Sequence, residues 1–170
     1  MGACMGEVNR FVSQFTNRFD AKGRLSVPAP FRTVMNRDGF EGLFLCQSLY
    51  QPALDCGGHG LLEDVEALLT GLSPHSEQWD VLATAVYAPS EIVKIDGEGR
   101  ILLGEAARRY AGLTDEALIV GLGRKFQIWE PARFAAHLAE AKRQVKVRRS
   151  DFEAQGAAGF PPPPMRGARE

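Results

Sequence analysis

The first half of the chain places short apolar runs between residues typical of turns. Phenylalanines spaced by four over residues 11–19 predict a strand, although the same spacing also suits a helix. A turn at 21–23 follows, and alternation of apolar and polar residues over 25–27 predicts a second strand that ends at a proline. Proline in a first helical turn favours a short helix over 30–35, and the apolar run 43–46 predicts another strand.

The second half repeats this order. It predicts a strand at 92–95, a turn at 97–99, a strand at 101–103, a helix at 105–111 and strands at 118–120 and 126–129. Two halves that share a strand, turn, strand, helix and strand in the same sequence indicate a duplicated unit.

The two turns carry the closest similarity between the halves. The stretch DAKGRLSVP begins at Asp20 and DGEGRILLG begins at Asp96, an interval of 96 − 20 = 76 residues. Gly23 and Arg24 therefore correspond to Gly99 and Arg100.

Longer helices separate and follow the two units. Apolar residues at helical spacing predict helices over 61–72, over a segment from 74 to 86, and over 131–145. The predicted organisation is a first unit with a helical segment over residues 1–88, a second unit with a C-terminal helix over 89–149, and a disordered tail rich in proline and glycine over 150–170.

Composition leaves room for one ordinary globular core or two small fused ones, with 170 residues of which 45% are hydrophobic. The formal net charge of −1 means that binding to nucleic acid cannot rest on overall basicity. The charge is segregated, however. Residues 9–37 carry six basic side chains and one acidic one, whereas residues 38–93 contain no lysine or arginine.

Other function classes receive little support. Three cysteines at unrelated spacings favour a reducing cytoplasm, and no apolar run has the length of a membrane span. The histidines are dispersed, and no motif of a hydrolase, nucleotide-binding protein or zinc protein is present. Cys56 and His59 lack two further ligands and are predicted to lie in a plain surface loop. We therefore expect no enzyme activity, cofactor, metal, membrane or small-molecule substrate.

The repeated turn offers chemistry of its own. Glycine permits a tight turn, and the aspartate can accept hydrogen bonds from the turn's N–H groups. An arginine fixed at the end of a strand suits bidentate contact with guanine or phosphate, because its donors form a rigid fork. The alternative is an ordinary β-turn closed by an internal Asp–Arg pair. Duplication and the basic surroundings of the first copy favour DNA binding, with the stronger role in that copy.

The candidate residues fall into two groups. The predicted DNA contacts are Arg18, Lys22, Arg24, Arg32 and Arg100. The predicted turn residues are Asp20, Gly23, Asp96 and Gly99.

The stretches NRFDAKGRLSVPAPFR and VKIDGEGRILLGEAARRYAGL resemble the MraZ family over roughly residues 9 to 145. The resemblance implies an α+β, β-rich fold of two tandem AbrB-like swapped-hairpin units with added helices, assembled into a ring. It also implies a nucleoid-associated regulator that binds tandem repeats in double-stranded DNA upstream of the division and cell-wall gene cluster, with repression as the suggested outcome. Gly104 in place of Pro28 and Glu98 in place of Lys22 distinguish the second copy from the first.

Two alternatives stay open at this point. The chain could instead be a ring-forming interaction scaffold that does not read DNA. The basic end of the last helix, over 142–149, is either a second DNA contact or a solvated helix end, and the second is favoured because cations are stabilised at a helix C-terminus.

Overall fold

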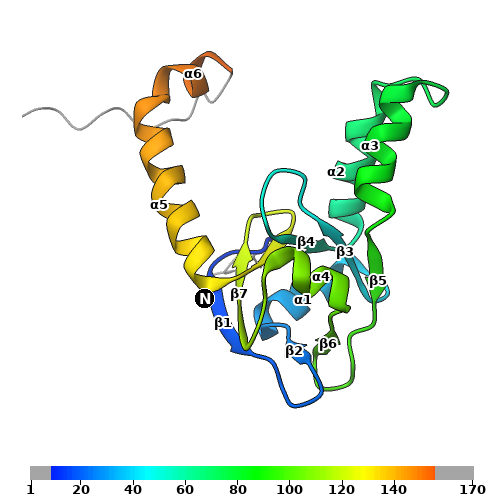
Figure 1. The fold of residues 1–170 in the computed structure, drawn as a ribbon, viewed down its shortest axis with the longest axis vertical. Coiled ribbons are helices and arrows are strands. Elements are labelled where there is room, and N and C mark those ends of the chain that lie inside the picture. Colours follow the sequence, from blue (N-terminus) through cyan, green and yellow to red (C-terminus); the bar gives the residue numbers. More distant parts are fainter. Residues whose placement is uncertain (1–8, 156–170) are drawn as a thin grey trace, which may run out of the picture. The chain divides into compact units, whose positions relative to one another are not determined.

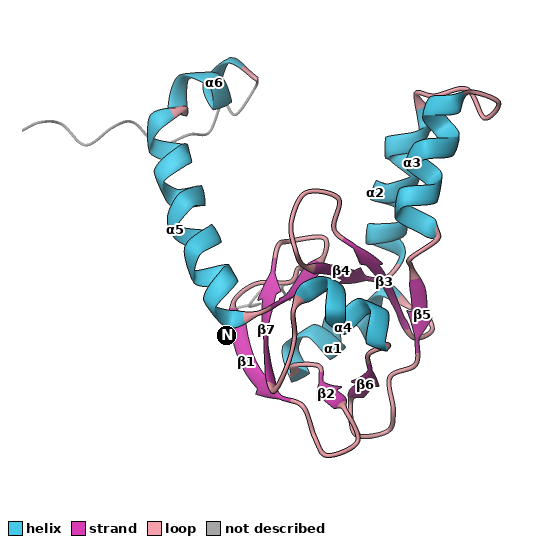
Figure 2. Ribbon diagram, in the orientation of Figure 1, coloured by secondary structure: helices cyan, strands magenta, loops and turns pink. Residues whose placement is uncertain are grey.

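The computed structural model describes residues 9–155 of the 170-residue chain. The described residues form two compact units, which divide between Phe134 and Ala135. The fold is α+β with antiparallel strands, as the sequence predicts (Figures 1 and 2).

The first half of the larger unit contains seven elements: β1 (Gln14–Arg18), β2 (Arg24–Ser26), α1 (Ala29–Asp38), β3 (Leu43–Gln47), β4 (Leu54–Gly57), α2 (His59–Thr70) and α3 (Glu77–Tyr87). The second half of the larger unit continues with β5 (Glu91–Val93), β6 (Arg100–Leu102), α4 (Glu105–Ala111), β7 (Glu116–Gly121) and β8 (Phe126–Trp129). Two helices follow, α5 (Pro131–Val147), which begins in the larger unit, and α6 (Arg149–Ala154).

Strands from the two halves interlock. Six of them form one sheet in the order β1-β7-β8-β4-β3-β5, so β1 pairs with β7 while β5 pairs with β3. The remaining strands, β2 and β6, pair with each other as a separate ribbon. The strands that begin one half are thus hydrogen-bonded to strands of the other half.

The main core lies where the halves meet. It includes Leu25, Phe31, Ile101 and Phe126 among its buried side chains. Phe31 and Phe126 face each other at 5.2 Å between ring centroids. A second apolar cluster joins β3 to α2 and α3. Because both faces of β3 are covered, its sequence is a continuous apolar run rather than an alternating one.

Helix ends follow their sequence signals. Pro30 lies in the first turn of α1, and Gly39 ends this helix in the left-handed conformation with φ of 73°. Ser76 caps α3 by accepting a hydrogen bond from the backbone N–H of Trp79 at 3.1 Å.

The sequence pattern missed β4. Its residues are Leu54, Asp55, Cys56 and Gly57, and neither alternation nor an apolar run marks them. Pairing with β3 on one side and β8 on the other makes this segment a strand. The prediction of a plain surface loop at Cys56 and His59 is therefore wrong, because Cys56 is fully buried in β4 and His59 begins α2.

The smaller unit contains most of α5 together with α6. Several of its arginines form ion pairs within these helices, with Glu140–Arg143 at 2.7 Å and Arg149–Glu153 at 2.8 Å. Residues 150–154 of the predicted tail are helical, as part of α6, and residues 156–170, including the four consecutive prolines, lie outside the described part of the chain.

Candidate nucleic-acid interface

The first repeated turn is closed by Asp20. One carboxylate oxygen, Oδ1, accepts hydrogen bonds from the backbone N–H groups of Lys22 and Arg24, both at 2.9 Å. The backbone N–H of Gly23 donates to the Asp20 carbonyl at 3.0 Å. The bond from the Arg24 N–H is the main cause that holds the pKa of the Asp20 carboxyl below its ordinary value.

The second turn has the same construction. Asp96 Oδ1 accepts from the backbone N–H groups of Glu98 and Arg100, both at 2.9 Å, and its pKa is lowered chiefly by the bond from Arg100. The duplication predicted from the sequence therefore extends to individual hydrogen bonds.

Each turn glycine is covered by an arginine from the opposite half. Gly23 and Gly99 both have φ of 78°, a conformation that favours glycine. A Cβ on Gly23 would lie 3.2 Å from Nη1 of Arg108, and one on Gly99 would lie 2.6 Å from Cδ of Arg32. Arg32 and Arg108 are themselves 108 − 32 = 76 residues apart. This reciprocal packing locks the two turns to α1 and α4.

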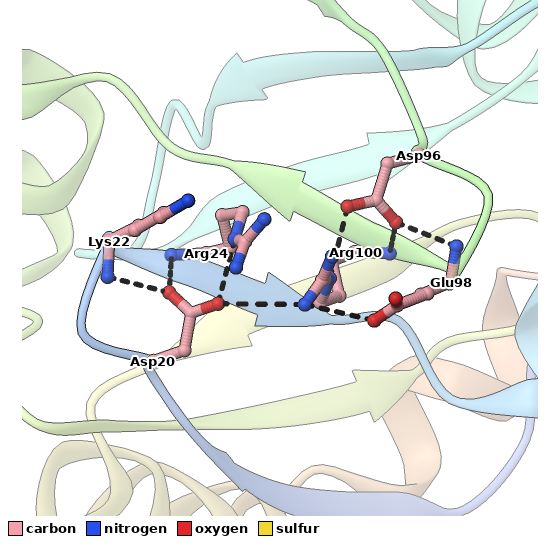
Figure 3. Close-up of polar contacts among 6 residues, drawn as sticks. All are labelled: Asp20, Lys22, Arg24, Asp96, Glu98 and Arg100. Atoms are coloured by element: carbon pink, nitrogen blue, oxygen red, sulfur yellow. Dashed lines mark hydrogen bonds and ion pairs between the residues drawn. The ribbon is translucent and has the colours of Figure 1, made fainter.

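The two turns lead into the β2–β6 ribbon, at the end of the larger unit away from α2 and α3 (Figure 1). Leu25 pairs with Ile101 at its centre, and both are buried in the core. Because side chains alternate along a strand, Arg24 and Arg100 lie on the opposite face of the ribbon (Figure 3). A two-stranded ribbon has a width that the DNA major groove admits.

Both arginines are paired with the aspartate of their own turn. Arg24 donates through Nε to Asp20 Oδ2 at 2.7 Å, and Arg100 donates through Nε to Asp96 Oδ2 at 3.0 Å. The side chains are 28% and 23% exposed. The internal Asp–Arg pair expected of an ordinary turn is thus present in both copies.

The pairing uses one of the five N–H donors of the Arg24 guanidinium and leaves the four on its Nη groups. Within residues 9–155 its Nη groups donate no hydrogen bond, and Asp20 is its only acidic partner. A guanidinium held through Nε is fixed in direction, while its Nη groups remain able to donate. The arrangement is chemically suited to an acceptor outside the turn.

Arg100 is more heavily neutralised. Its Nη1 lies 3.0 Å from Glu98 Oε2 and 3.9 Å from Asp20 Oδ2, in addition to the Asp96 bond (Figure 3). The six side chains drawn in Figure 3 comprise three cations and three anions, so the ribbon face is formally neutral by itself.

Uncompensated positive charge comes from the surroundings of the first turn. Arg18 and Lys22 are exposed and have no acidic partner among residues 9–155. Arg108 lies over the Phe19 ring at 4.1 Å and donates to the carbonyl of Thr114 at 2.7 Å. Arg32, beside the second turn, donates to the carbonyl of Val27 at 3.1 Å. The sequence interpretation did not include Arg108 in the site, although its 76-residue interval from Arg32 was a usable signal.

Comparison with known proteins gives long matches at high identity. A family model described as "MraZ protein, putative antitoxin-like" matches residues 87–152. A protein of Methylocella silvestris named "Transcriptional regulator MraZ" is 54% identical over 161 residues, which cover 94% of this chain and 98% of that protein. The chain belongs to the MraZ family.

Other members of the MraZ family match almost as well. Proteins with the same name from Beijerinckia indica and Xanthobacter autotrophicus are 52% and 50% identical, over 96% and 84% of this chain. The matches confirm the resemblance stated from the repeated turns. They cover both halves of the chain, whereas the family model covers the second half and part of the last helices.

The histidine and cysteine side chains described next in this MraZ-family chain lie in surroundings that suit a structural role. His59 Nδ1 lies 3.0 Å from an Asp38 carboxylate oxygen at the start of α2. Burial raises the pKa of the Cys46 thiol to about 12 and also raises that of the Cys56 thiol well above its ordinary value. In the part of the chain that the structure describes, no three histidine, cysteine or acidic side chains are grouped to hold a metal ion.

None of the helices within residues 9–155 is both long enough and apolar enough to span a bilayer.

Proposed function

We propose that this chain is a sequence-specific DNA-binding transcription regulator that presents the β2–β6 ribbon to the duplex. The observation that carries the proposal is the state of Arg24, whose guanidinium is oriented by Asp20 through Nε while its Nη groups have no hydrogen-bond partner within residues 9–155. Such a group can donate two parallel hydrogen bonds to guanine O6 and N7, the commonest specific contact of arginine in the major groove.

The other candidate residues have supporting roles. Arg18 and Lys22 provide exposed charge for phosphate contacts beside the first turn, and Arg32 adds positive charge beside the second. Arg100 lies on the same face of the ribbon as Arg24 but is paired with the acidic side chains of its own turn. Asp20, Gly23, Asp96 and Gly99 hold the turns in shape rather than touching DNA. Phosphate contacts fix position and base contacts confer specificity, so the two groups of residues have separable effects.

The relatives support this role. Each of the three quoted above is named a transcriptional regulator. We extend that role to this chain, together with a non-enzymatic mechanism, a cytoplasmic location and association with the nucleoid.

We further propose that the two interlocked halves are tandem AbrB-like units and that subunits assemble into a ring. A formally neutral ribbon binds DNA weakly by itself, but several ribbons held at fixed spacing raise the effective concentration of each following contact. Tandem repeats in a promoter are the matching target, and the resemblance to the family suggests repression of the division and cell-wall genes.

Binding to the DNA upstream of the chain's own gene tests the proposal. A labelled duplex of this region is titrated with the full-length protein at several salt concentrations, and fluorescence anisotropy gives the affinity. Arg24→Ala is expected to weaken specific binding by about 5- to 150-fold, the worth of one bidentate base contact. The affinity of the unaltered chain is expected to fall steeply with salt.

Arg143→Ala is the matched control. It removes an arginine that is likewise paired to an acid, Glu140, but lies on α5 in the smaller unit. Equal affinities for the unaltered chain and the Arg24→Ala variant would remove Arg24 from the mechanism. An intact oligomer that fails to bind any DNA at low salt would support the scaffold instead.

A further inference from the structure

Glu98 and Lys22 occupy the same place in the two turns. They are 98 − 22 = 76 residues apart, and the backbone N–H of each donates to its turn's aspartate at 2.9 Å. The backbone of the two turns is therefore equivalent at this position, and the difference between them lies in the side chain.

That difference changes the state of the neighbouring arginine. The Glu98 carboxylate lies 3.0 Å from Nη1 of Arg100, whereas Lys22 cannot pair with Arg24. Among the described residues, Arg100 has three carboxylates within 4.0 Å, those of Asp96, Glu98 and Asp20, and Arg24 has one.

A bidentate contact needs two adjacent donors of one guanidinium. Nε of each arginine is already used by the turn aspartate, so the Nη groups must supply the contact. Glu98 occupies one of them in Arg100 and also places a negative charge where a phosphate or a base acceptor would approach (Figure 3).

We propose that Glu98 is a specificity-determining residue that withholds Arg100 from DNA, so that the first turn of each subunit reads bases and the second does not. The inference rests on the proposed function, because it assigns unequal roles to the two turns of the same interface. It also explains how a duplicated ribbon can read an asymmetric site, since only one of its two arginines is available.

The pair is one that DNA or a substitution can displace. The Glu98 side chain is 73% exposed, and exposed ion pairs contribute little to stability because water and salt screen them. Removing the carboxylate is therefore expected to change DNA affinity without unfolding the turn, which its backbone hydrogen bonds retain.

The test is a double-mutant cycle on the full-length protein. Anisotropy titrations with the upstream duplex and with a scrambled duplex of equal length compare the unaltered chain, Glu98→Gln, Arg100→Ala and the double variant. Glu98→Gln is expected to bind the upstream duplex about 2- to 5-fold more tightly. This gain is expected to disappear when Arg100 is absent.

Two matched variants separate charge from position. Glu41→Gln removes one negative charge at an exposed site between α1 and β3. Its affinity for the upstream duplex is expected to stay within about 1.5-fold of that of the unaltered chain. Lys22→Glu gives the first turn the acidic residue that the second turn has at this position, so it is expected to weaken binding at least about 5-fold through capture of Arg24.

The outcomes distinguish the two proposals. If the unaltered chain binds and Arg24→Ala weakens binding as expected, but the affinity of Glu98→Gln equals that of the unaltered chain, the proposed function stands and this inference is overturned. A gain from Glu98→Gln that persists without Arg100 overturns it as well. Failure of the unaltered chain to bind either duplex overturns both.

Discussion

Single residues decide the shape of the β2–β6 ribbon. Gly23 and Gly99 are required for two reasons, a positive φ and the close approach of an arginine from the other half. Gly39 has a similar φ of 73° but nothing within 4 Å of its missing Cβ. Comparison of these glycines separates backbone strain from crowding.

Gly99→Ala is predicted to destabilise the fold more than Gly39→Ala. The left-handed conformation alone costs about 1 to 2 kcal/mol for alanine. At position 99 the new methyl group must also displace Arg32, which would lose its hydrogen bond to the Val27 carbonyl. Urea unfolding of the two variants measures the difference. Equal losses of unfolding free energy would show that Arg32 moves away without cost.

Asp20 and Asp96 make the turns sensitive to acid. Both have a lowered pKa in the folded chain, so their stabilising effect is complete above the ordinary value of 3.8 and is lost as the pH falls through the lowered one. At pH 7 the Asp20→Asn/Asp96→Asn double variant is predicted to have a lower melting temperature than the unaltered chain. The difference between the two melting temperatures is predicted to narrow as the pH falls from about 5 to 2. Melting followed by circular dichroism at several pH values measures it. A gap independent of pH would contradict the assignment.

Individual elements differ in how far their sequences determine them. The ribbon, α1, α4 and β3 follow from apolar spacing, turn glycines and prolines, which are local signals. β4 was missed because it becomes a strand through partners that lie on both sides in the sheet. Among side chains, the turn arginines were found from the repeat, and their pairing with the turn aspartates is local to each turn. The contribution of Arg108 depends on packing between the halves.

A buried polar network joins β4 to β8. Asp55 accepts hydrogen bonds from Lys125 at 2.8 Å and from Gln127 at 2.7 Å, and Gln127 in turn accepts from the Trp129 indole at 2.8 Å. Asp55 and Gln127 are both buried. The network therefore determines which residues of the two central strands face each other.

Asp55→Ala is predicted to cost about 1 to 3 kcal/mol of unfolding free energy, because it leaves the buried amide of Gln127 without an acceptor and the half-buried Lys125 without its ion-pair partner. The control is Glu105→Ala, which breaks a shorter ion pair, 2.6 Å to Arg109, between side chains that are both mostly exposed. Glu105→Ala is predicted to change the unfolding free energy by no more than about 0.5 kcal/mol. Denaturant unfolding of both variants provides the comparison, and a larger loss from Glu105→Ala would refute it.

At the scale of the whole molecule, interlocking makes the halves interdependent. The pairs β1–β7, β3–β5 and β2–β6 all join one half to the other, and Tyr110 on α4 donates to the Ser48 carbonyl after β3 at 2.6 Å. The residue pattern shows the repeat but not the exchange of strands between halves, since two adjacent units and two interlocked units have the same pattern of residues. Swapped hairpins were expected only from the family resemblance.

The interlocked unit is predicted to unfold in a single transition. Loss of either half removes partners of four strands of the other half, so no stable intermediate with one intact half is expected. Calorimetric and van't Hoff enthalpies of the full-length chain should agree, measured at a concentration that keeps the oligomeric state constant. Two separable transitions within residues 9–134 would show that the halves are independent.

The most direct test of the central claim is a footprint of the full-length protein on the DNA upstream of its own gene. The proposed ring predicts short protected segments that recur at a regular interval. Arg24 is held by Asp20 through Nε, and its Nη groups are able to donate, so this protection is predicted to vanish with Arg24→Ala. Protection that persists in the Arg24→Ala variant, or no protection at any protein concentration, would contradict the claim.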